Sequence, residues 1–269
     1  MELENLIEDI INNSKGDIAV AIKNLESNST IMINEKEVFP SASTIKLLIM
    51  VTAMQEVKEG KRNLKDKIII STEEKCGGDG ILKELNKDHN FTLIEIITLM
   101  IIISDNTATN ILIDMLGMDN INKIANELKL NNTRLQRKMM DSEAVKMGKE
   151  NLTTALDMCT ILEMLYKGEI VDKEYSNIMI EILKKQQVNG RLTLYLPDDL
   201  VVAHKTGDLD KLEHDVGIVY YPYCNYIICV LTKNLYTNKE GREIIGKISY
   251  EVYKSFKKFH RNNVSNIIN

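Results

Sequence analysis

Strand-like segments lie near both ends of this chain, and helical segments fill its middle. The segments rich in β-forming residues are 17–24, 30–34, 200–206, 216–221 and 226–232. The first two flank a turn-prone stretch and predict a hairpin, and short consecutive strands with tight links favour antiparallel pairing. The pattern predicts an α+β fold in a single domain of two lobes. We expect a sheet-and-helix lobe from residues 1–38 and 195–269, and an all-helical lobe from residues 39–194.

Apolar residues recur at helical spacing through most of the rest of the chain. The predicted helices cover residues 2–12, 43–57, 92–104, 108–116, 121–130, 154–166, 175–187 and 239–256. The helix at 43–57 is apolar around most of its circumference, which predicts a central, buried position. Residues 131–151 are polar and irregular, and so long a connection in a compact domain is often functional.

The composition excludes several classes of protein. The chain has 269 residues, of which 44% are hydrophobic, and this suits one large domain. Its net charge is −5 with both signs interspersed, so no basic face for nucleic acid stands out. The longest apolar stretch, 93–103, is too short to span a bilayer. We expect a monomer that binds neither nucleic acid nor membranes.

The sequence also bears on compartment and cofactors. The first residues lack the basic start and apolar run of a secretion signal, so the chain as given is expected to be cytoplasmic, or secreted if a leader has been removed. The four cysteines lack metal-ligand spacing and are expected to be free thiols, at positions Cys76, Cys159, Cys224 and Cys229. No metal or organic cofactor signature is present.

Three short strings have the residue types that serine acyl transfer needs. They are Ser-x-x-Lys at 43–46, Ser-Asp-Asn at 104–106 and Lys-Thr-Gly at 205–207. A chain of this length holds about one Ser-x-x-Lys by chance, and a second occurs at 255–258 without companions. The ordered trio is far less likely to be accidental than any one string.

The first string places a hydroxyl and an amine one helical turn apart. Ser43 lies where a helix is expected to begin, so unpaired N–H groups and the helix dipole would stabilise an oxyanion. Lys46 lies three residues on, and as a neutral amine it could take the Ser43 proton. Burial and a nearby Lys205 would lower its pKa. The alternative is that Ser43 only caps the helix and that Lys46 lies on the surface.

The second string follows one predicted helix and precedes another. Its functional interpretation assigns Ser104 to proton relay toward the leaving group and Asn106 to a hydrogen bond with a substrate amide. Asp105 would hold the loop by bonding to backbone. The alternative is a loop with an ordinary helix cap.

The third string ends a β-like run. Lys205 and Thr206 would bind a substrate carboxylate by charge and hydroxyl, and Gly207 would let substrate backbone lie close to the strand. The Asp208 N–H would complete an oxyanion hole with that of Ser43. The alternative is a strand end with a turn.

With all three strings in this order, the chain resembles the class A β-lactamases over nearly its whole length. The match includes residues 104–108 and the Leu-Pro pair at 196–197 before the third string. The resemblance implies a five-stranded antiparallel sheet flanked by helices, a helical subdomain and a site between them. It also implies that a β-lactam or related acyl compound acylates Ser43, that Lys46 is the base or relay, and that water releases the product. Ser104, Asn106, Lys205 and Thr206 would complete the site.

The long loop departs from the family pattern. The family carries Arg-x-Glu-x-x-x-Asn there, and its Glu activates the deacylating water. Residues 133–137 match, but Met139 falls where the Glu belongs, and Asp141 and Glu143 are the only nearby carboxylates. A general base contributes about 10²–10⁴-fold to its step. The sequence therefore predicts intact acylation and slow deacylation, unless Asp141 acts as the catalytic base.

Two other functions remain open. The same residues could serve a penicillin-recognising peptidase, esterase or amidase that acts on a non-antibiotic substrate. Alternatively, the chain could be a non-catalytic module that is acylated without turnover. The locally basic stretch 254–261 is expected to be the solvated end of a C-terminal helix rather than a binding patch.

Overall fold

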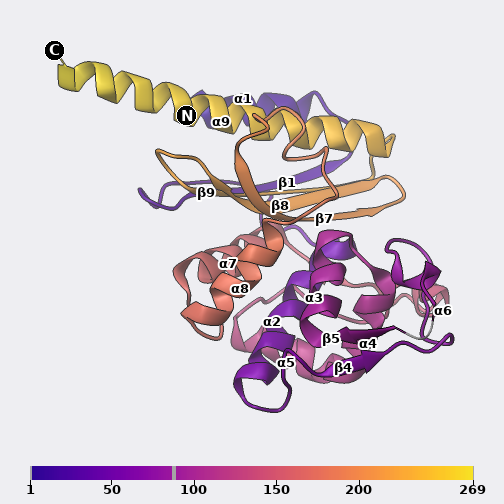
Figure 1. Ribbon diagram of the computed structural model, residues 1–269. Helices are drawn as coiled ribbons and strands as arrows, with labels where there is room; N and C mark the ends of the chain where they lie inside the picture. The colour runs from indigo at the N-terminus through magenta and orange to yellow at the C-terminus, as the bar shows by residue number, and fades with distance from the viewer. Residues whose placement is uncertain (1, 87–88, 269) are drawn as a thin grey trace.

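A five-stranded antiparallel sheet built from both ends of the chain forms one half of the molecule (Figure 1). The computed structural model describes residues 2–86 and 89–268, and the side chains of these residues up to 258. The strand order is β2-β1-β9-β8-β7. The strands are β1 (Asp17–Asn24), β2 (Thr30–Ile33), β7 (Val201–Leu209), β8 (Leu212–Tyr220) and β9 (Tyr226–Lys233). The predicted fold class and sheet are confirmed.

Helices cover both faces of this sheet, as Figure 1 shows. On one face lie α1 (Glu2–Asn12) and α9 (Asn238–Ile268), and on the other lies α7 (Ala155–Lys167). Because side chains alternate along a strand, Val20 and Ala21 enter different cores. Val20 packs in the core beneath α1 and α9, and Ala21 packs in the larger core that continues into the helical half.

The helical half is built around α2 (Lys46–Lys58), which is buried along most of its length as predicted. Its other helices are η1 (Ala42–Ile45), η2 (Leu82–Glu84), α3 (Leu93–Ile102), α4 (Asn106–Leu116), α5 (Met118–Glu127), α6 (Ser142–Lys146) and α8 (Lys173–Leu183). Two short two-stranded sheets accompany them: β3 (Phe39–Pro40) with β6 (Leu152–Thr153), and β4 (Lys67–Ile69) with β5 (Asn90–Thr92). The residue bounds of the two lobes stay a prediction.

Several elements differ from the sequence-based expectation. Helix α9 continues to Ile268 instead of ending at residue 256. Helix α8 ends at Leu183, and Gln186 beyond it uses its side chain to donate to the carbonyls of Ile101 and His204. The predicted helix at 43–57 begins as the 3₁₀ turn η1 and becomes α-helical at Lys46.

The strands β7 and β8 form a longer hairpin than expected. The Lys-Thr-Gly string lies inside β7 rather than at its end, and β8 starts at Leu212. Sequence patterning missed this start because three consecutive polar residues are buried there, and each has a partner. Glu213 bonds Arg191. His214 bonds the carbonyl of Pro40, and Asp215 bonds His204.

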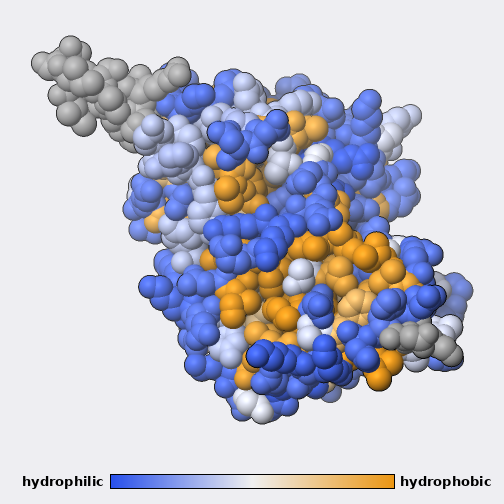
Figure 2. All heavy atoms as spheres, in the orientation of Figure 1, coloured by the Kyte–Doolittle hydropathy of each residue, from blue (hydrophilic) through white to orange (hydrophobic). Residues whose placement is uncertain are grey.

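Three further findings concern helix hydrophobicity, the surface and the thiols. No helix in the described part of the chain is both long and apolar enough to cross a membrane. Figure 2 shows a mostly hydrophilic surface over the sheet half and a broad apolar area on the helical half in this view. All four cysteines are free, as predicted.

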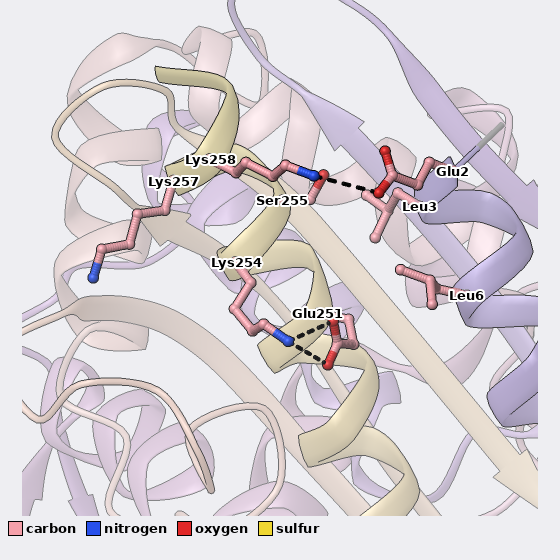
Figure 3. Close-up of a pocket in the computed structure, with 8 residues that line it drawn as sticks. All are labelled: Glu2, Leu3, Leu6, Glu251, Lys254, Ser255, Lys257 and Lys258. Atoms are coloured by element: carbon pink, nitrogen blue, oxygen red, sulfur yellow. Dashed lines mark hydrogen bonds and ion pairs between the residues drawn. The ribbon is translucent and has the colours of Figure 1, made fainter. Parts of the chain in front are cut away.

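The second Ser-x-x-Lys string, at residues 255–258, lies on α9. Ser255 and Lys258 line a groove of about 500 Å³ between α9 and α1 (Figure 3). Lys258 turns toward Glu2 and pairs with it at 3.4 Å, and Lys257 points away from the groove. The residues of this string therefore lie on the surface of a helix, as ordinary surface residues do.

Candidate active site

The candidate nucleophile lies on the 3₁₀ turn that leads into α2. Ser43 is partly exposed, and its neighbours Ala42 and Thr44 are buried. The turn is fixed from before and behind, because Ser41 N–H donates to Asn151 O at 2.7 Å and Thr44 Oγ1 donates to Ser41 O at 2.6 Å. Ala42 has φ +45°, a conformation that is costly for an L-residue and is often found at functional sites.

Strand β7 runs directly beside this turn. A β-carbon placed on Gly207 would lie 2.9 Å from the backbone nitrogen of Ser43 and 3.1 Å from the Ala42 β-carbon. Gly207 therefore permits a close approach of the turn that carries Ser43, a neighbour that the sequence did not predict. Its contact with substrate stays a prediction.

Ser104 joins the first and third strings. Its Oγ accepts from Lys46 Nζ at 3.0 Å and from Lys205 Nζ at 3.2 Å. Lys46 Nζ also donates to Ser104 O at 2.8 Å and to Asn106 Oδ1 at 3.0 Å. One hydroxyl thus bridges two lysines that are 159 positions apart in the sequence.

Both lysines are fully buried, and this changes their acidity. Burial lowers the pKa of Lys46 to about 7, against the opposing pull of Asp79 and Asp105. Burial first, and then the charge of Lys46, lowers the pKa of Lys205 well below its ordinary value. The expected lowering for Lys46 is present, with burial as its main cause, while the like-charge repulsion acts on Lys205.

The backbone around Ser104 is held in an unusual conformation. Ser104 has φ +57°, which costs about 1 kcal/mol or more for a residue with a β-carbon. Asp105 fixes it as expected: its carboxylate caps α4 through Ala108 N–H at 2.9 Å and accepts from the N–H groups of Ile81 and Leu82. The strained residue is therefore locked between α3 and α4.

These groups meet a cleft of about 350 Å³ between the two halves. Ser43, Asn106, Asp141 and Asp208 are among the residues that line it. Lys46 and Lys205 lie beneath the cleft and reach it through Ser104 and Asn106. The structure thus brings the three strings together, as the sequence predicted, and their catalytic roles stay a proposal.

Met139 lies on the cleft wall with its backbone held at both ends. It is 9% exposed. Its N–H donates to Asn110 Oδ1 at 2.8 Å, and its carbonyl accepts from Asn110 Nδ2 at 3.1 Å. The next residue, Met140, is 60% exposed with φ +60° and approaches Gly78 across the cleft. Position 139, where the family pattern has a Glu, therefore carries a buried apolar side chain whose backbone is held by Asn110.

The two nearby carboxylates have different positions. Asp141 lines the cleft, and its Oδ1 accepts from Ala144 N–H at 2.9 Å, which makes it the cap of α6. Glu143 pairs with Lys146 at 2.8 Å with both side chains exposed to solvent. Asp141 is thus the loop carboxylate that can reach the cleft.

Comparison with known proteins agrees with this arrangement. Residues 2–256 match the sequence profile of the β-lactamase enzyme family. The chain belongs to this family. β-Lactamase VEB-1 of Pseudomonas aeruginosa is 24% identical over 92% of this chain and 87% of that protein. A β-lactamase of Bacteroides uniformis is 26% identical over 95% of this chain and 92% of its own length.

Solved structures of the β-lactamase fold are similar over almost all of the chain. The β-lactamase of Sphaerobacter thermophilus DSM 20745 has 29% identity and a TM-score of 0.87, covering 94% of this chain and 96% of its own. PBP-A has 29% identity and a TM-score of 0.88, covering 96% and 97%. A Leu-to-Glu variant of PBP-A was solved as an acyl-enzyme complex with penicillin G, at the same identity and TM-score.

Sequence reasoning missed two charged residues of this β-lactamase-family site. Asp79 lines the cleft from the segment Cys76-Gly77-Gly78-Asp79-Gly80, whose three glycines within four residues were a signal for a loop in close contact. Arg191 lies at the sheet side and bonds Asp208 and Glu213. No local sequence pattern indicated a role for Arg191, because its partners Asp208 and Glu213 lie on the β7–β8 hairpin, later in the chain.

Proposed function

We propose that this protein is a class A-type serine hydrolase that transfers the acyl group of a β-lactam to Ser43 and releases it slowly. The observation that carries the proposal is the pair of buried lysines bridged by Ser104 beneath the turn of Ser43. Membership of the β-lactamase enzyme family supports it.

In acylation, Ser43 Oγ attacks the lactam carbonyl while neutral Lys46 takes the hydroxyl proton. A pKa of about 7 keeps a useful fraction of Lys46 neutral at neutral pH. The new bond is Ser43 Oγ to acyl carbon, and the bond that breaks is the lactam C–N bond. The proton passes from Lys46 through Ser104 Oγ to the leaving nitrogen, along the 3.0 Å contact.

The remaining site residues position the substrate and stabilise charge. The backbone N–H groups of Ser43 and Asp208 serve as the oxyanion hole. Asn106 contacts the acyl side chain, although its own amide also bonds Lys46 and Gly77 O. Lys205 and Thr206 face the substrate from β7, on the side of the cleft opposite Asn106.

Deacylation is the slow step because Met139 supplies no base. Thioether sulfur cannot take a proton from water at neutral pH. Asp141 is the carboxylate that sustains residual release, and its role as an α6 cap holds one of its oxygens away from that task. A protein of this design accumulates the acyl-enzyme.

Intact-mass measurement after mixing with benzylpenicillin tests the proposal. A persistent adduct of one penicillin mass is expected on the native protein and none on Ser43→Ala. Ser255→Ala is the matched control, because it removes the serine of the isolated Ser-x-x-Lys string on α9, and its adduct should persist. Fast hydrolysis without a detectable adduct would overturn slow release, and an adduct on Ser43→Ala would overturn the assignment of the nucleophile.

A second candidate is a penicillin-recognising peptidase, esterase or amidase. Two observations favour it: the apolar Met139 and the similarity to PBP-A over 96% of this chain. A chromogenic cephalosporin assay beside a p-nitrophenyl ester assay separates the candidates. Slow turnover of the cephalosporin after an adduct has formed supports the first candidate, and turnover of the ester alone identifies the second. A complete absence of turnover of both compounds identifies a non-catalytic binding module.

A further inference from the structure

A buried arginine reaches the edge of the cleft and is already occupied. Arg191 follows α8 and is nearly buried, with its side chain 4% exposed. Its Nη2 donates to Asp208 Oδ1 at 2.8 Å, and its Nε donates to the buried Glu213. Asp208 is 44% exposed at its side chain and lines the cleft. Asp208 of the cleft wall is therefore paired with the guanidinium group of Arg191, which could otherwise bind an anionic ligand.

The charges in this cluster balance. Arg242 from α9 also pairs with Glu213, at 3.2 Å. Two guanidinium groups, Arg191 and Arg242, thus face two carboxylates, Asp208 and Glu213. The formal charges of these four groups therefore cancel.

Asp208 lies next to the expected position of a substrate carboxylate. Thr206 and Asp208 are two residues apart in β7, so their side chains share a face of the strand and their Cα atoms lie roughly 7 Å apart. Two further carboxylates, Asp79 and Asp141, line the same cleft. A negative group bound at Thr206 would meet these three carboxylates, opposed by the buried Lys205 beside it, whose pKa burial lowers well below its ordinary value.

We propose that Asp208 is a specificity-determining residue: its carboxylate occupies Arg191 and selects against acyl donors that carry a carboxylate beside the scissile bond. Among β-lactams and related acyl compounds, the site then acylates faster with those that are uncharged or cationic at that position. This inference rests on the proposed acylation of Ser43 and specifies its substrate class.

The test uses two compounds that differ by one charge. Benzylpenicillin and its methyl ester carry the same acyl group, and only the first has a free carboxylate. Second-order rate constants for adduct formation on Ser43 are measured by intact mass on the native protein, on Asp208→Asn and on Asp210→Asn. Asp210 is exposed, lies outside the cleft lining and carries the same charge two residues away, so its variant controls for net charge.

The measured quantity is the ratio of the acid rate to the ester rate, which cancels the intrinsic reactivity of each compound. Asp208→Asn is expected to raise this ratio about tenfold, the effect of about 1.4 kcal/mol, and Asp210→Asn to leave it within about twofold. Raised salt should raise the native ratio, because ions screen the repulsion. An unchanged or lower ratio in Asp208→Asn overturns the inference while the adduct itself upholds acylation. If neither compound forms an adduct with the native protein, the proposed function fails, and the inference fails with it.

Discussion

Gly207 of β7 and Ser43 of η1 come so close that a β-carbon on the glycine would lie 2.9 Å from the serine backbone nitrogen. Real β-carbons essentially never approach other atoms more closely than about 3.0 Å. The contact explains how a strand near the end of the chain and a turn near its start form the two walls of one cleft. It also means that the position of Ser43 depends on a missing methyl group.

Gly207→Ala should therefore displace the Ser43 turn. We expect a loss of about 1–3 kcal/mol in the free energy of unfolding, as for other overpacked sites, and a fall in the acylation rate of about tenfold or more. Urea denaturation and adduct formation measure the two effects. Gly77→Ala is the matched control, because a β-carbon at Gly77 meets nothing within 4 Å. Equal behaviour of the two variants would show that the close contact does not constrain the turn.

Met139→Glu should speed release of the acyl group by about 10²-fold or more, because it places a general base on the cleft wall. Met139→Gln, of similar size and without basicity, should leave the adduct as long-lived as in the native protein. The lifetime of the penicillin adduct, followed by mass, distinguishes them. Similar lifetimes for both variants would indicate that position 139 does not face the attacking water.

Asp141→Asn isolates the basicity of Asp141 from its structural role. An asparagine Oδ1 can still accept the Ala144 N–H bond that caps α6, so the helix should remain and the fold should keep its stability within about 0.5 kcal/mol. The residual rate of deacylation should fall about tenfold or more. If that rate does not change, Asp141 serves only as a cap.

The acylation rate should rise with pH through about 7, the pKa to which burial lowers Lys46. Below that pH Lys46 is protonated and cannot take the Ser43 proton, so the rate should fall about tenfold per pH unit. Stopped-flow acylation across pH 5 to 9 gives the profile. A rate that is flat below about pH 7 would exclude Lys46 as the base, and Lys46→Arg, charged at every pH tested, should abolish the rise.

Acid should destabilise the fold through His214. Burial lowers the pKa of His214 from 6.5 to about 4, although its Nε2 lies 2.8 Å from Pro40 O and its Nδ1 lies 2.8 Å from Glu213 O and 3.1 Å from Thr232 N. Between about pH 6.5 and about pH 4 the unfolded chain binds a proton at this residue and the folded chain does not. Stability is therefore lost as the pH falls from about 6.5 to about 4, by about 3 kcal/mol in all.

Urea midpoints at several pH values test this loss. His214→Gln can still donate to Pro40 O and cannot titrate, so its stability should fall less steeply with acid than that of the native protein. His89→Gln, at an exposed position, is the control. Parallel curves for His214→Gln and the native protein would assign the acid sensitivity to other groups.

The sequence was a good guide to local structure and to which three strings meet, while the roles of the site residues stay a proposal. β-Forming segments at both chain ends predicted the sheet, and the apolar circumference of residues 43–57 predicted a buried α2. Spacing and order placed Ser43, Ser104 and Lys205 in one cleft, because each string has chemical meaning only beside the others. Tight links between short strands predicted antiparallel pairing, and family resemblance supplied the five-stranded sheet and the missing carboxylate at Met139.

Features that depend on tertiary partners were not predictable from the sequence. The start of β8 was missed because Glu213 is polar and yet buried, with Arg191 and Arg242 as partners from distant elements. The same holds for Arg191, which is connected to the cleft wall through its ion pair with Asp208. Burial of Lys46 by surrounding helices, and not the charge of Lys205, is the main cause of its lowered pKa.

The pairing of β1 with β9 joins segments from opposite ends of the polymer. Ser43, Lys46 and Ser104 leave the ribosome long before Lys205 does, so a growing chain carries a nucleophile without half of its surroundings. The site is complete only after the C-terminal strands have paired with the N-terminal strand β1. Under the proposed mechanism, covalent capture of penicillin would therefore report completed folding.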